Sequence, residues 1–82
     1  MDRASVVILE RTLDLAVELL PEDDRLIECL DVIRFYLESP DSDSEERLQH
    51  AVAELRAIAR RNQQLLIAAR LEAFLQKRSD VA

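Results

Sequence analysis

The chain has 82 residues, enough for one small domain, and chains of this length bury only about 60–65% of their unfolded surface. Hydrophobic residues make up 49% of it and charged residues 34%, glycine is absent, and the net charge is −6. The acidic balance opposes strong binding to phosphates, and the absence of glycine excludes a glycine loop that cradles them. The abundance of Leu and Ala predicts apolar surface left over for a second chain.

Charge divides the chain into two unlike halves. Residues 1–43 contain twelve acidic and four basic residues, a net charge of −8, and residues 44–82 contain five acidic and seven basic residues, a net charge of +2. Because mixed surface charges attract one another, we expect the halves to attract each other, within one chain or across a dimer. The acidity of the first half also leaves open an acidic nucleic-acid mimic as an alternative function.

The first two elements are predicted to be helices over about 3–20 and 22–38, because apolar residues recur at spacings of three and four and Pro21 separates the two runs. The apolar arc of the first helix is wide enough to be covered from two sides. The apolar stripe of the second contains Cys29, whereas Phe35 falls among the charged residues. Phe35 is either an incidental surface side chain or an anchor for a partner, since aromatic residues are enriched at interface hot spots.

The remaining segment, about 44–78, follows the loop around Pro40 and contains neither Gly nor Pro. Its helix propensity favours one long helix, whose C-terminal end extends beyond the first two helices and into a second chain. The alternative is a break in the polar run near 60–64, which makes a four-helix bundle. Asn62 is correspondingly either a buried residue that sets helix register or an exposed residue at the break. Both versions predict an all-α fold, a single domain over 1–82, completed by dimerisation.

Residues that could support catalysis are few and scattered. His50, the single histidine, falls nearly opposite the apolar stripe of its helix and is expected to be solvated, with a phosphorylated histidine as the alternative. Cys29, the single cysteine, is expected to be a buried, unreactive thiol. The sequence therefore predicts that the protein is not an enzyme and has no catalytic, cofactor-binding or metal-binding residues. It predicts a cytoplasmic location, because a lone cysteine fits a reducing compartment and no apolar run approaches the ~20 residues of a membrane span.

The stretch of about eighteen residues from Ile58 to Leu75, with Asn62 and a double leucine ahead of an amphipathic tail, resembles the late helix of flagellar-type export chaperones. The resemblance implies a chaperone that grips a secreted substrate. It also implies a substrate-binding face formed by Leu66, Ile67, Leu71 and Phe74.

Together these patterns predict a non-catalytic protein–protein interaction module, such as an adaptor, chaperone or inhibitor, that acts through apolar helix faces and forms a homodimer. A small nucleic-acid-associated regulatory protein is the alternative from a different class. The arginines of the 44–78 segment, however, are scattered around the helix, and no aromatic residues are interleaved with them. This arrangement disfavours direct binding to nucleic acid. The predicted partner interface comprises Leu65, Leu66, Ile67, Leu71, Phe74, Leu75 and Phe35.

Overall fold

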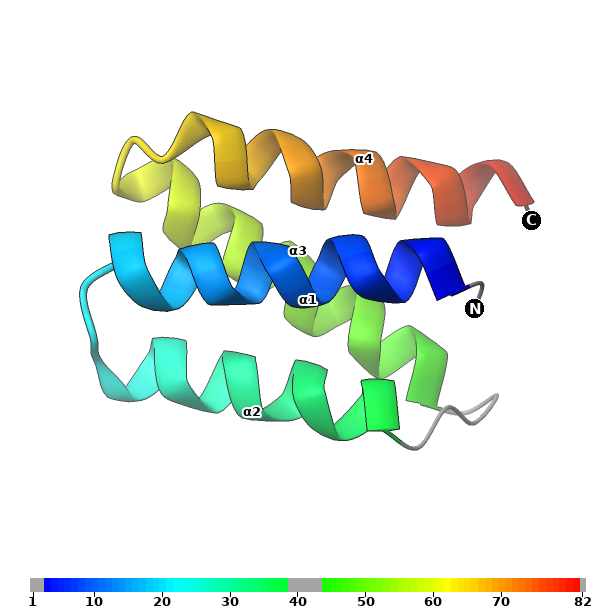
Figure 1. The fold of residues 1–82 in the computed structure, drawn as a ribbon, viewed down its shortest axis with the longest axis horizontal. Helices are drawn as coiled ribbons and strands as arrows, with labels where there is room; N and C mark the ends of the chain where they lie inside the picture. The colour runs from blue at the N-terminus through cyan, green and yellow to red at the C-terminus, as the bar shows by residue number, and fades with distance from the viewer. Residues whose placement is uncertain (1–2, 39–43, 82) are drawn as a thin grey trace.

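The computed structural model describes residues 3–38 and 44–81 and arranges them in four helices (Figure 1). The helices are α1 (Arg3–Leu19), α2 (Asp24–Glu38), α3 (Ser44–Arg61) and α4 (Leu65–Val81). No strand occurs within the two described ranges. The all-α fold is confirmed, and so is the alternative with a break in the third segment. The single long helix that was favoured from the sequence is wrong.

The helices form a bundle of 31 × 22 × 18 Å in which α1 lies between α2 and α4 while α3 crosses behind it on a diagonal (Figure 1). α3 packs closely against both α2 and α4, and α1 packs more closely against α4 than against α2. One continuous core includes residues from every helix. Its fully buried large side chains are Leu9, Leu13, Ile33, Leu48, Leu55, Ile67, Leu71 and Val52.

The connection between α1 and α2 ends in a helix cap formed by Asp23. Its Oδ1 accepts a hydrogen bond from the N–H of Leu26 at 2.8 Å, and its backbone carbonyl accepts one from the N–H of Ile27 at 3.0 Å. A side chain at this position satisfies a backbone donor that has no partner inside the helix. α2 therefore begins at Asp24 instead of at about 22, and Pro21 lies in the connection ahead of the cap.

The break between α3 and α4 is a Schellman motif built without glycine. The N–H of Gln64 donates to the carbonyl of Ala59 at 2.9 Å, and the N–H of Gln63 donates to the carbonyl of Arg60 at 3.1 Å. This pair of bonds satisfies carbonyls at the end of α3 and requires one residue in the left-handed conformation. Gln63 supplies it with a φ of 61°, a conformation that glycine adopts at lower energy.

The chain reverses at this break, so that α4 runs back across the bundle instead of continuing away from it (Figure 1). Asn62 is exposed, and its side-chain amide donates to the carbonyl of Ile58 at 2.9 Å, which confirms its position at the break and excludes a buried register-setting role. An ion pair between Arg60 Nη2 and Glu72 Oε2, 3.2 Å apart, joins the two helices after the reversal. α4 is thereby packed against α1 and α3 of its own chain.

Candidate functional site

The outer face of α4 is exposed to solvent, and yet most of its residues are apolar. Its exposed residues up to position 76 are Leu65, Leu66, Ala69, Arg70, Ala73 and Gln76, so that four of the six are apolar and one is charged. In α3, by contrast, five of the exposed residues are charged and one, Ala57, is apolar. Leu65 and Leu66 are 70% and 61% exposed. Contiguous exposed apolar side chains mark interaction surfaces, whereas isolated ones need no explanation.

Three residues of the predicted interface lie instead in the core of the chain itself. Ile67, Leu71 and Phe74 project from the inner side of α4 into the bundle, and Leu71 has 0% exposure. Leu75 is half-buried and packs against the same core. The cause is the chain reversal before α4, which turns this side of the helix onto α1 and α3. The face implied by the resemblance to export chaperones is therefore not exposed as a unit, and Leu66 is its one exposed member.

The outer face of α2 is an acidic stripe with one aromatic residue. Phe35 is 62% exposed there, and its ring meets that of Tyr36 edge to face, with centroids 5.2 Å apart and planes at 82°. Four exposed acidic residues share this stripe at spacings of four, three and seven residues: Asp24, Glu28, Asp31 and Glu38. The exposed Arg34 lies at the edge of the stripe, three residues after Asp31 and four before Glu38. Within the described part of the chain, none of these four carboxylates belongs to an ion pair.

An open groove of about 1160 Å³ follows the junction of α2 and α3. Arg25 pairs with Glu54 across it at 3.2 Å, and Arg47 donates to the hydroxyl of Tyr36 at 3.4 Å. His50 is exposed at the groove, as its position in the sequence predicted. Among the residues that the structure describes, no group of three or more His, Cys, Asp and Glu side chains could hold a metal ion. Acidic and basic groups alternate along the groove, so it offers no field of one sign to a charged ligand.

Cys29 lines the same groove but is buried, which confirms the predicted burial. Its Sγ donates a hydrogen bond to the carbonyl of Ala51 at 2.9 Å. Burial, followed by the charge of Glu54, raises the pKa of the thiol to about 11. Because the thiolate is the nucleophilic form, a thiol that stays protonated at neutral pH is a poor nucleophile.

Sequence reasoning missed buried polar residues on α1. Ser5 and Thr12 are both buried, and Thr12 Oγ1 donates to the carbonyl of Ile8 at 2.8 Å. This bond to the preceding turn lets a threonine occupy the core with its hydroxyl satisfied. The spacing of the sequence indicates the burial of Thr12, because it lies three residues after Leu9 and four before Ala16, both of which belong to the core.

The surface of the bundle thus includes an apolar outer face on α4 and an acidic stripe on α2. α1 also exposes large apolar side chains, namely Val7, Ile8, Val17 and Leu19. None of the helices described is long and apolar enough to cross a membrane. In comparisons with known proteins, the chain matches no family model, no curated protein and no solved structure.

Proposed function

We propose that this protein is a non-catalytic protein–protein interaction module that binds through the outer face of α4. The observation that carries the proposal is the composition of that face, where Leu65, Leu66, Ala69 and Ala73 are exposed and Arg70 is the one charged residue among them. Transferring a leucine side chain from water into an interface is worth up to about 1.5–3 kcal/mol. The two exposed leucines therefore favour a state in which another protein surface covers them.

Adaptors, chaperones and inhibitors all act by binding or masking another protein, and this face serves any of the three. The inner side of α4 contributes to stability and not to binding, since Ile67, Leu71 and Phe74 are buried. Phe35 provides a second exposed anchor on α2. Self-association, of which the predicted homodimer is the simplest form, belongs to the same proposal, because a further copy of the chain is one way to cover apolar residues that a single copy leaves exposed. We place this activity in the cytoplasm, where a protein with one buried free thiol, Cys29, keeps it reduced.

The proposal is tested by placing a photo-crosslinking amino acid at position 66 or 73 of α4 in cells that make the protein. We expect discrete crosslinked adducts from both positions, and we expect Leu65→Glu to weaken them, because an added charge opposes burial of the face. The matched control is the same crosslinker at Ala57, an exposed alanine on α3. Equal adducts from position 57, or none from positions 66 and 73, would refute an interaction through α4.

A further inference from the structure

The acidic stripe of α2 and the apolar face of α4 complement each other in charge and in chemistry. We propose that the outer face of α4 binds the acidic stripe of a second copy of this chain, so that copies associate head to tail. This inference rests on the proposed function and names the partner of the same surface. It is supported by unpaired charges of opposite sign on the two surfaces and by the opposite positions of those surfaces in the bundle.

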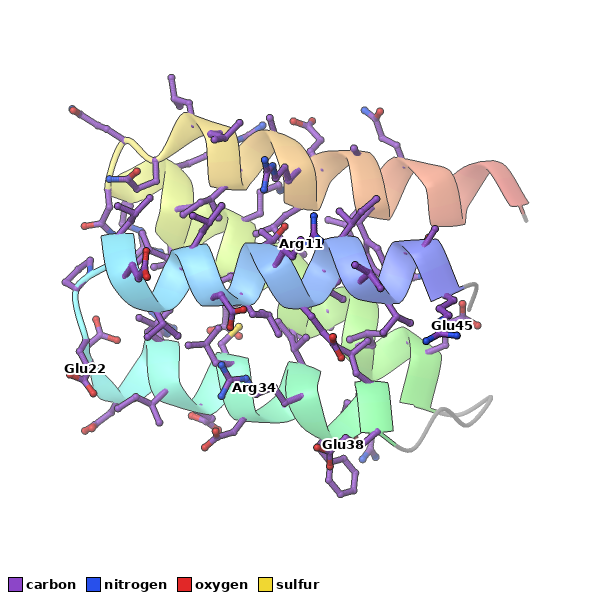
Figure 2. All side chains as sticks on the ribbon, viewed as in Figure 1. Arg11, Glu22, Arg34, Glu38 and Glu45 are labelled. Carbon is purple, nitrogen blue, oxygen red and sulfur yellow. The ribbon has the colours of Figure 1, made fainter. Side chains whose placement is uncertain are left out.

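Arginines accompany the apolar residues of α4. Arg70 lies within the face, Arg61 is exposed at the end of α3 just ahead of it, and Arg11 extends from α1 toward α4 (Figure 2). Ion pairs in the described residues involve none of these three guanidinium groups. The apolar surface also continues from α4 toward α1, because Ile8 is exposed three residues before Arg11 and so lies on the same side of its helix. A partner that fits here presents carboxylates around an apolar side chain.

The acidic stripe of α2 has this composition. Its four carboxylates are unpaired within the described residues, and Phe35 stands among them with 62% of its surface exposed. An aromatic side chain of this kind contributes a large apolar area with few rotatable bonds. Ala69 and Ala73 are small residues between which a ring can approach the backbone of α4 closely. Arginine and carboxylate groups brought together at the edge of such a contact form charge-assisted hydrogen bonds.

The positions of the two surfaces decide how copies assemble. α2 and α4 lie on opposite sides of α1, so one molecule can use both surfaces at once (Figure 1). When two copies are joined through unlike surfaces, the pair still has a free α4 face at one end and a free acidic stripe at the other. Further copies can therefore bind, and assembly does not stop at two. Two copies joined through α4 alone would instead place their Arg70 side chains in one interface and leave the acidic stripes unpaired.

A contact between one helix face and another is expected to be weak, since interfaces below about 1,200 Å² of total buried area are weak. We therefore expect sedimentation of the full chain to show a mass that rises past the dimer with concentration. We expect it to fall back toward the monomer between about 50 and 500 mM NaCl, because salt screens charges at a solvent-exposed edge.

Two single variants separate this assembly from any other. Leu66→Glu blocks the α4 face and Phe35→Arg blocks the α2 stripe, and both residues are exposed, so the fold is retained. Each variant alone should be monomeric at concentrations where the parent protein assembles. Mixed in equal amounts, they should form a one-to-one heterodimer, since each supplies the surface that the other lacks. Ala57→Glu, on the outer face of α3, should assemble like the parent chain.

Several outcomes would overturn the inference. A parent chain that stays monomeric at every concentration would do so, as would an assembly that stops at the dimer and survives Phe35→Arg, which would indicate pairing through α4 alone. A mixture of the two variants that stays monomeric would equally exclude head-to-tail contact. If the chain is monomeric but a different protein is crosslinked from positions 66 and 73, the second copy is wrong as partner while the proposed function stands.

Discussion

Both sides of α4 contain large apolar residues, but their surroundings are opposite. The inner side places Ile67, Leu71 and Phe74 in the core, whereas the outer side leaves Leu65 and Leu66 in solvent. Leucine contributes nothing to the stability of a monomer where it remains in water, and it contributes a great deal where it is packed among other side chains. The apolar residues of one helix therefore serve two separate purposes, the fold on one side and association on the other.

The same substitution should change the free energy of unfolding by different amounts on the two sides of α4. Leu71→Ala is expected to lower the free energy of unfolding by about 2–5 kcal/mol, since it leaves a cavity in a fully buried site. Leu66→Ala should change it by no more than about 0.5 kcal/mol, because its side chain is 61% exposed. Urea unfolding followed by circular dichroism measures both. A loss of several kcal/mol with Leu66→Ala would show that the outer side is already packed.

The alkylation rate of Cys29, a buried residue of α2, measures how accessible the interior of the bundle is. A rise in the thiol pKa from 9.0 to about 11 leaves roughly 100-fold less thiolate at pH 8 than in the unfolded chain. We expect alkylation of the folded protein to be slower by at least that factor than alkylation in denaturant, where the thiol is free. A rate within threefold of the denatured rate would mean that the interior opens readily.

The same thiol predicts how stability depends on pH. Because its pKa is raised in the folded state, the stability it contributes is complete below about pH 9 and is lost as the pH rises toward 11. Cys29→Ser should remove this alkaline decline, and urea titrations at pH 8 and 10.5 compare the two proteins. An unchanged decline in the serine variant would assign it to other groups.

The smallest effect is expected at Gln63, in the turn where α3 ends and the chain reverses before α4. Gln63→Gly should raise the free energy of unfolding by about 0.5–1 kcal/mol, because glycine adopts a φ of 61° without the steric cost that glutamine bears. Arg61→Gly, in the last turn of α3, is the control and should lower stability by a similar amount. Thermal melts of both variants compare them. Destabilisation by Gln63→Gly would indicate that the motif depends on the glutamine side chain.

The local pattern of the sequence was sufficient for much of the molecule. Spacings of three and four residues predicted the first two helices, with ends that differ by a few residues, and the helical character of 44–78, and they placed Cys29 inside and His50 outside. Phe35 was correctly separated from the apolar stripe of α2. These predictions succeed because each depends on one helix with a clear apolar side, and such a helix has only one way to face a core.

The orientation of α4 was decided by the tertiary structure alone. Its leucines, isoleucine and phenylalanine surround the helix, so that periodicity contains no signal for which side is inner. The choice follows from the reversal at Gln63, a residue without the usual preference for a left-handed turn, so the sequence offered a break near 60–64 only as the alternative. Once the chain reverses there, packing on α1 and α3 buries Ile67, Leu71 and Phe74. Leu65 and Leu66 stay outside because a helix can turn only one side toward its own core.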